Sequence, residues 1–254
     1  MCLIAWNWQP GVDSPLLLVA NRDEFYARPT AALHWWPDAP ILAGCDGQAG
    51  GTWLGVSRTG RLAALTNYRS PAMTRSDAPS RGELVSNFLR GNDTAGDYLR
   101  QLQGAAKQYN PFNLLVFDGA TLLGLQSRDA SLVTLQPGVG AVSNADFHTP
   151  WPKLNQLQRG LQEQLAQGAP GDAQLLALLH DRTPAADADL PSTGVPLELE
   201  RALSAAFVAM PGYGTRASSV VRYVQGQISF LEHRFDAQGD AGTTALGCHY
   251  ELFK

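Results

Sequence analysis

The chain has 254 residues, a formal net charge of −4, 44% hydrophobic residues and 17% charged residues. This composition is typical of a globular protein, and we expect one domain over residues 1–254. The acidic balance without a basic run excludes a nucleic-acid surface, and no apolar stretch approaches the ~20 residues of a membrane-spanning helix. The three cysteines lack paired spacing and the first residues lack the pattern of a signal peptide, which together indicate a cytoplasmic protein.

The predicted elements form two strand-rich regions with helices inserted between them. Apolar and alternating patterns predict strands at residues 2–8, 16–20, 52–57, 61–67, 113–118, 121–127, 132–135, 139–143, 218–225, 227–235 and 245–253. One-face spacing predicts helices at 81–89, 93–108 (capped by Asp93), 152–167 and 172–180. Residues 34–37 and 183–196 are expected to be loops. Strands at both ends of the chain favour α+β layers whose terminal strands share a sheet.

Cys2 follows Met1 and opens the first predicted strand. Because cysteine is small, we expect Met1 to be removable, which would place a thiol and a free α-amine on one residue. An α-amine titrates near ~7.7–8.0 and a thiol near ~8.5, so the neutral amine could accept the thiol proton. The simpler interpretation is a small buried strand residue, which is common for free cysteine.

The string Asn21-Arg22-Asp23-Glu24 follows the apolar strand at 16–20. Alternation predicts that Asn21 and Asp23 lie on one face of the strand and Arg22 and Glu24 on the other. Taken alone, this string is typical of a solvated strand end with a local ion pair.

Further polar residues follow other strands or a glycine loop. Asn67 ends residues 62–66, Asn144 ends residues 139–143, and Arg216 follows residues 212–215. A strand-end Asn is commonly a turn former. This set would also suit thiol acyl chemistry, because Asn amides donate to a developing oxyanion and Arg binds a carboxylate or stabilises a thiolate.

Signatures of metals and dinucleotides are weak. The five histidines are scattered without an i,i+4 pair, so we expect no metal site. Residues 212–217 fit G-x-G-x-x-A, but the β-branched residues after them favour a strand where a dinucleotide site needs a helix. We therefore expect no cofactor.

Several blocks of the chain recur in one order in a known family. They are Met1-Cys2, residues 21–26 with Arg28-Pro29, residues 50–55, 62–68 and 81–85, Tyr109-Asn110 with 112–114, residues 143–145 with 149–151, and residues 211–216. In these blocks the chain resembles, nearly end to end, the NRDE family, also called the transport-and-Golgi-organisation family. That family in turn resembles N-terminal-nucleophile hydrolases of the cholylglycine hydrolase and penicillin acylase type.

The resemblance implies a four-layer αββα sandwich with two stacked sheets and an N-terminal cysteine nucleophile, which Cys2 matches. It also implies roles for an Asn after a central strand, a second strand-end Asn and a late Arg, which Asn67, Asn144 and Arg216 match. In those enzymes an Arg and an Asp are separated by two residues, whereas Arg22 and Asp23 are adjacent, so either Asp23 or Glu24 could face the thiol. The predicted catalytic residues are Cys2, Arg22, Asp23, Asn67, Asn144 and Arg216, and the predicted substrate-binding residues are Asn21, Glu24, Trp53, Tyr68 and Tyr213.

Two functions follow from these expectations. The first is an N-terminal-cysteine amidohydrolase or acyltransferase-like protein acting on a small amide or thioester. The second is a non-catalytic protein on the same fold that binds and traffics lipid, acyl-CoA or haem, as the family resemblance suggests. Trp35, Trp36, Trp53, Tyr68 and Phe112 would then line an apolar pocket, although buried aromatic residues more commonly belong to the core.

Overall fold

The computed structural model describes residues 1–250, whose strands form two antiparallel sheets. The first sheet contains β1 (Cys2–Trp8), β2 (Leu16–Phe25), β10 (Gly138–Val142), β11 (Ala209–Met210), β12 (Tyr213–Val224), β13 (Gln227–Asp236) and β14 (Gly239–His249). The second contains β3 (Thr30–Trp35), β4 (Ile41–Asp46), β5 (Leu54–Ser57), β6 (Leu62–Asn67), β7 (Phe112–Phe117), β8 (Leu122–Gln126) and β9 (Ser131–Thr134). Strand order is β10-β1-β2-β12-β13-β14, with β11 beside β12, in the first sheet and β3 to β9 in sequence in the second.

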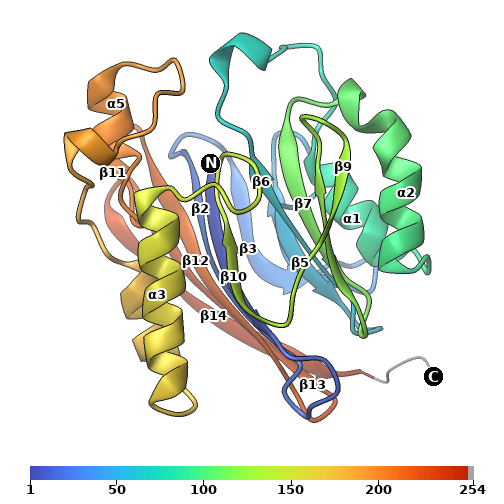
Figure 1. Ribbon diagram of the computed structural model, residues 1–254. Helices are drawn as coiled ribbons and strands as arrows, with labels where there is room; N and C mark the ends of the chain where they lie inside the picture. The colour runs from blue at the N-terminus through green and yellow to red at the C-terminus, as the bar shows by residue number, and fades with distance from the viewer. Residues whose placement is uncertain (251–254) are drawn as a thin grey trace.

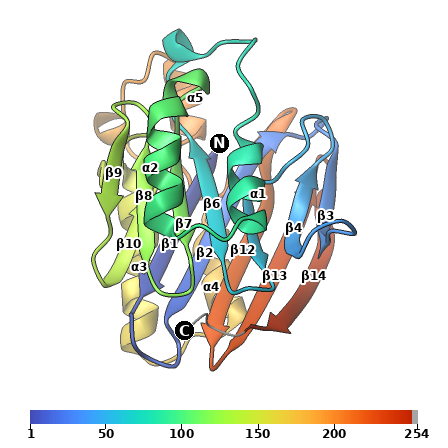
Figure 2. The same cartoon turned by 90° about the vertical axis from the view of Figure 1, so that its right-hand side faces the viewer.

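The sheets pack face to face and helices cover their outer faces (Figure 1). The helices are α1 (Gly82–Arg90), α2 (Ala95–Ala105), α3 (Pro152–Ala166), α4 (Asp172–Leu179) and α5 (Leu197–Ala202), with short 3-10 turns at Pro71–Met73, Ala106–Gln108 and Asp187–Asp189. Helices α1 and α2 pack on the second sheet, where Figure 2 shows them in front of its strands, and α3 and α4 pack on the first. The predicted αββα sandwich is thus confirmed.

Alternation along β1 separates the two cores. Ile4 and Trp6 belong to the cluster between the sheets, whereas Leu3 and Ala5 pack against α3 and α4. Because side chains alternate across a strand, every second residue of β1 points into the space between the sheets. Cys2 has the same parity as Ile4 and therefore lies at the end of that inner face.

Most predicted elements are confirmed within one or two residues, and β1 and β14 share a sheet as expected. The strands predicted at 16–20 and 218–225 were too short, because β2 continues to Phe25 and β12 begins at Tyr213. Asn21, Arg22 and Asp23 therefore lie within a strand and are buried, so the expectation of a solvated strand end was wrong. The prediction that Asp93 caps α2 was wrong. Thr94 is the N-cap of this helix, and Thr94 Oγ1 accepts a hydrogen bond from the Asp97 N–H at 3.1 Å. Strand β3 covers part of the expected 34–37 loop, and β4 and α5 were not predicted. Strand β14 begins earlier than the predicted 245–253 strand, whose last residues lie outside the described part of the chain.

Among residues 1–250 no helix is long and apolar enough to cross a membrane.

Candidate active site

Cys2 lies at the wall of a cleft of about 590 Å³. It pairs with Arg22 in the β1–β2 ladder, so the two side chains share the face that points between the sheets. The Cys2 side chain is buried, at 5% exposure, but the cleft beside it opens to solvent. The cleft is lined by residues of both sheets and of the loop before α1, among them Cys2, Arg22, Asp23, Glu24, Asp46, Trp53, Asn67, Arg81, Arg216 and Glu232.

Burial holds the Cys2 thiol in its neutral form while Met1 precedes it. Desolvation raises the pKa of Cys2 to about 11, and the amino terminus and Arg22 oppose this only in part. Burial also lowers the pKa of the Met1 amino group. The thiol therefore has a cation and an amine near it, but in this state the amine belongs to Met1.

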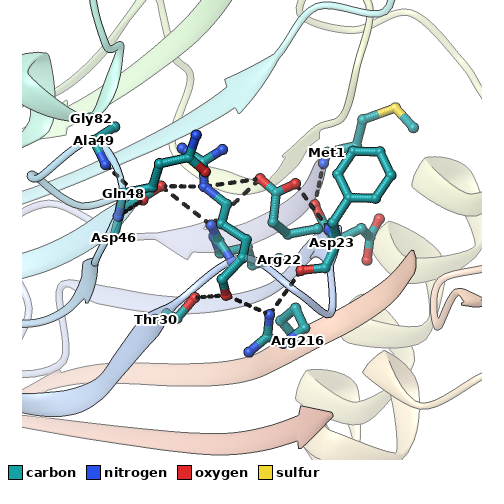
Figure 3. Close-up of polar contacts among 12 residues, drawn as sticks. Met1, Arg22, Asp23, Thr30, Asp46, Gln48, Ala49, Gly82 and Arg216 are labelled. Carbon is teal, nitrogen blue, oxygen red and sulfur yellow. Dashed lines mark hydrogen bonds and ion pairs between the residues drawn. The ribbon is translucent and has the colours of Figure 1, made fainter. Parts of the chain in front are cut away.

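Arg22 is part of an ion-pair cluster at the cleft wall (Figure 3). Its guanidinium lies 3.6 Å from both Glu24 and Asp46, and Arg28 lies 2.8 Å from Asp46. Burial raises the pKa of Asp46, but the Arg28 hydrogen bond and the backbone N–H groups of Gln48 and Ala49 outweigh it, so the net shift is downward. Glu24 thus faces the guanidinium that lies next to Cys2.

Asp23 points to the opposite face of β2. One carboxylate oxygen accepts a hydrogen bond from Thr215 Oγ1 at 2.8 Å, and its backbone carbonyl accepts from the Met1 amino group. Tyr213 Oη also accepts from this amino group, at 2.9 Å, and donates to the Asp23 carbonyl at 3.2 Å. Of the two acidic residues considered for the thiol, Asp23 therefore lies by the amino terminus and Glu24 by Arg22.

The two strand-end asparagines meet across the sheets. Asn67, at the end of β6, lines the cleft. Asn144, just after β10, is fully buried and its Nδ2 donates to the Asn67 carbonyl at 2.9 Å. Asn144 is not among the residues that line the cleft, so its contact with the site runs through Asn67.

Arg216 lines the cleft at a β-bulge between Thr215 and Ala217. Its guanidinium donates to the carbonyls of Phe25, Tyr26, Arg28 and Phe235 at 2.9 to 3.2 Å. These bonds fix the 25–28 turn, from which Arg28 Nε donates to Asp46 at 2.8 Å. Through these contacts Arg216 stabilises the cleft wall.

The predicted substrate-binding residues divide into two groups. Glu24 and Trp53 line the cleft, and Tyr213 contacts the amino terminus. Asn21 is fully buried away from the cleft, where its Nδ2 donates to the carbonyls of Leu179 and Ala206. Tyr68 is also absent from the cleft wall, and its backbone N–H donates to the Pro111 carbonyl.

Sequence reasoning missed several charged residues around Cys2. Arg81 and Asp46 line the cleft, and Arg69, Lys153 and Glu200 form a buried group near Met1. Arg81 and Asp46 are in or near the family blocks, which was the available signal. Lys153 gave none, because a lysine in the first turn of an amphipathic helix usually faces solvent.

Comparison with known proteins identifies the family of the chain. Residues 1–237 match the family described as Transport and Golgi organisation 2. The chain belongs to this family. It is 37% identical over 259 residues to the Transport and Golgi organization protein 2 homolog of Bos taurus, and 36% identical over 257 residues to that of Homo sapiens. Each alignment covers 91% of this chain and 92% of the relative.

Solved structures show the same fold at low identity. A variant of conjugated bile acid hydrolase from Clostridium perfringens aligns with a TM-score of 0.52 and 8% identity, covering 100% of this chain and 98% of that chain. The Caenorhabditis elegans ortholog of N-acylethanolamine-hydrolyzing acid amidase aligns with a TM-score of 0.50 and 11% identity, covering 87% of this chain and 92% of that chain. The fold of this family member is therefore that of N-terminal-nucleophile hydrolases.

Proposed function

We propose that the chain is an N-terminal-cysteine amidohydrolase or acyltransferase that acts on a small amide or thioester once Cys2 carries the free amino group. The observation that carries this proposal is the position of Cys2 at the cleft wall, paired with Arg22 and in the same cleft that Asn67 lines. The hydrolase-type fold and family membership support it.

In the first step, the Cys2 α-amine accepts the thiol proton and Sγ bonds to the substrate carbonyl carbon. The carbonyl π electrons move to oxygen, and the Asn67 side-chain amide is the candidate donor to this oxyanion. Removing one oxyanion donor typically costs about 10²–10³ in rate. The Asn144 hydrogen bond positions the Asn67 backbone for this role.

In the second step, the tetrahedral intermediate collapses and the carbon–nitrogen or carbon–sulfur bond of the leaving group breaks. The Cys2 ammonium gives its proton to the leaving amine or thiolate, which leaves an acyl thioester on Cys2. Water, or an acceptor amine, then attacks this thioester with the α-amine as base, and the thiol is restored.

The Arg22 cluster supplies the electrostatics of this scheme. Arg22 is 9% exposed at the side chain and is held between Glu24 and Asp46, so its charge stays fixed beside the thiol. A fixed cation near a buried cysteine favours the thiolate.

The experiment compares two chains, one freed from a tag directly before Cys2 and one freed directly before Met1. Hydrolysis of a short acyl thioester is followed by release of the free thiol. We expect turnover only in the chain that begins at Cys2, and its loss in Cys2→Ala but not in Cys248→Ser, because Cys248 lies outside the cleft wall. Equal hydrolysis by the Cys2→Ala chain would refute the proposal. If the parent chain and the Cys2→Ala variant both bind acyl-CoA tightly and neither turns it over, the carrier alternative is favoured.

A further inference from the structure

Met1 lines the same cleft as Cys2 and is held there in a defined cluster of polar residues. Asp23, Arg69 and Tyr213 form hydrogen bonds with Met1. Glu200 pairs with Arg69, and the charge of Lys153 interacts with those of Asp23, Arg69 and Glu200. We call these five residues the Met1 cluster. The Met1 sulfur accepts a hydrogen bond from Arg69 Nε at 3.2 Å, and the Met1 carbonyl accepts from the Asp23 N–H at 2.6 Å. Met1 thus occupies a space with polar groups on several sides, one peptide unit from Cys2.

Three side-chain atoms of this cluster are buried without a hydrogen-bond partner among residues 1–250: Lys153 Nζ, Arg69 Nη2 and Asp23 Oδ2. Lys153 is 2% exposed and Asp23 is 1% exposed. Leaving a buried polar group unpaired costs about 1–3 kcal/mol, so an intact site would be expected to supply a partner.

Glu200 does not supply that partner. One of its oxygens accepts from Arg69 Nη1 at 2.6 Å, and the other accepts the backbone N–H and the hydroxyl of Thr193. Asp23 lies near Lys153 but makes no ion pair with it within 4.0 Å. The charges of Lys153 and Asp23 are therefore complementary but separated by a gap.

Removal of Met1 would leave this cluster rich in donors. The Asp23 N–H and Arg69 Nε would lose their acceptors and join the unpaired Arg69 Nη2 and Lys153 Nζ. The acceptors, Asp23 Oδ2, the Asp23 carbonyl and Tyr213 Oη, suit the N–H groups of the new amino terminus at Cys2. The remaining donors, the Arg69 guanidinium and Lys153 Nζ, would then need an anionic oxygen group as acceptor. Arg and Lys together are typical ligands of a carboxylate.

We infer that Arg69 and Lys153 bind a carboxylate of the substrate in the space that Met1 occupies. This inference rests on the proposed function and names its substrate class: a small amide or thioester with a carboxylate next to the scissile group, as in an N-acyl amino acid. Met1 then blocks the carboxylate subsite until Met1 is removed.

The test is a calorimetric titration of the chain that begins at residue 2 and carries Cys2→Ala, which binds but does not turn over. N-acetyl-L-methionine is the charged probe, and N-acetyl-L-methionine amide is its uncharged match. We expect the carboxylate to bind about tenfold more tightly than the amide, a difference of about 1.4 kcal/mol. Lys153→Met and Arg69→Lys should each remove this preference, and the Met1-bearing chain should bind neither probe.

Arg159→Gln is the matched control, because Arg159 lies on α3 with 72% of its side chain exposed. It should leave the preference unchanged. Equal binding of the two probes by the parent chain would overturn the inference without any substitution in the cluster. Equal probe binding by the Met1-bearing chain, or displacement by inorganic phosphate at lower concentration than by acetate, would also overturn it. Because no turnover is measured, either result leaves the thioester hydrolysis test independent.

Discussion

The buried side-chain amide of Asn144 donates to the backbone carbonyl of Asn67 at 2.9 Å, which joins the end of β10 to the end of β6 at the cleft. This bond links the two sheets where Cys2 lies. A strand-end asparagine that would serve as a turn former in isolation here fixes the position of a second asparagine.

Asn144→Ala should destabilise the fold and loosen the cleft. Asn144 is fully buried, so the substitution would leave the Asn67 carbonyl without its buried hydrogen-bond donor. We expect a loss of about 1–3 kcal/mol in the free energy of unfolding. Urea denaturation measures it. Asn155→Ala, on the exposed surface of α3, should stay within about 0.5 kcal/mol of the parent, and an equal effect of the two substitutions would contradict this role.

The reactivity of Cys2 in the Met1-bearing chain should depend steeply on pH. With a pKa of about 11, the thiolate fraction at pH 7 is about one ten-thousandth. Alkylation by iodoacetamide, located on Cys2 by peptide mass, should therefore accelerate about tenfold per pH unit between pH 7 and 10. A plateau below pH 9 would show that the thiol is not held neutral by burial.

Lys153→Met should stabilise the protein at pH 7. Burial lowers the pKa of Lys153 to about 8, so the unfolded chain binds this proton more tightly than the folded chain. The cost is fully present below pH 8 and fades as the pH rises toward the ordinary value of 10.5. We expect a gain of about 1–3 kcal/mol in the variant at pH 7 and a smaller gain at pH 10. A gain that does not change with pH would contradict the assignment to the Lys153 charge.

Arg216→Lys should weaken the wall of the cleft although it keeps the charge. Lysine cannot reproduce the fork that donates to the carbonyls of the 25–28 turn and of Phe235. We expect a loss of about 1–3 kcal/mol in urea denaturation and slower thioester hydrolysis. If hydrolysis falls while stability is unchanged, Arg216 contacts the substrate, and stabilising the cleft wall is not its main role.

Gly51→Ala should be among the costliest small substitutions near the cleft. Gly51 has φ of +71°, and a Cβ there would lie 2.6 Å from the Gly82 backbone carbon, so both backbone strain and a clash oppose it. We expect a loss above about 2 kcal/mol in thermal or urea unfolding. Gly104→Ala is the control: this glycine lies in α2 with no atom within 4 Å of the added carbon, and alanine should stabilise it by about 0.5–1 kcal/mol.

Local patterns predicted most of the strands and helices that carry the site, but not β4 with Asp46 or α5 with Glu200. The alternation of apolar residues in β1 and β2 placed Arg22 and Glu24 on one face and Asn21 and Asp23 on the other, as the structure shows. The family blocks supplied the sandwich. What local patterns lacked was the tertiary partner of each polar residue: Asn21 and Arg216 satisfy backbone carbonyls far along the chain, and the neighbours of Lys153 come from distant segments.

The edge strand β3 and its neighbour β4 were harder to predict for a related reason. Their register is irregular between Ala31 and His34, so the side-chain period of two is broken within the strand. The tryptophans and proline at 35–37 then suggested a loop.

Cys2, with its own free α-amine as the base, is the proposed nucleophile. The most direct test of this proposal is intact mass of the chain that begins at Cys2, before and after incubation with an activated acyl ester, with the adduct located by peptide mass. We expect one acyl group on Cys2 that forms at neutral pH and is absent from the Met1-bearing chain. An unlabelled Cys2, or equal labelling when Met1 is retained, would contradict it.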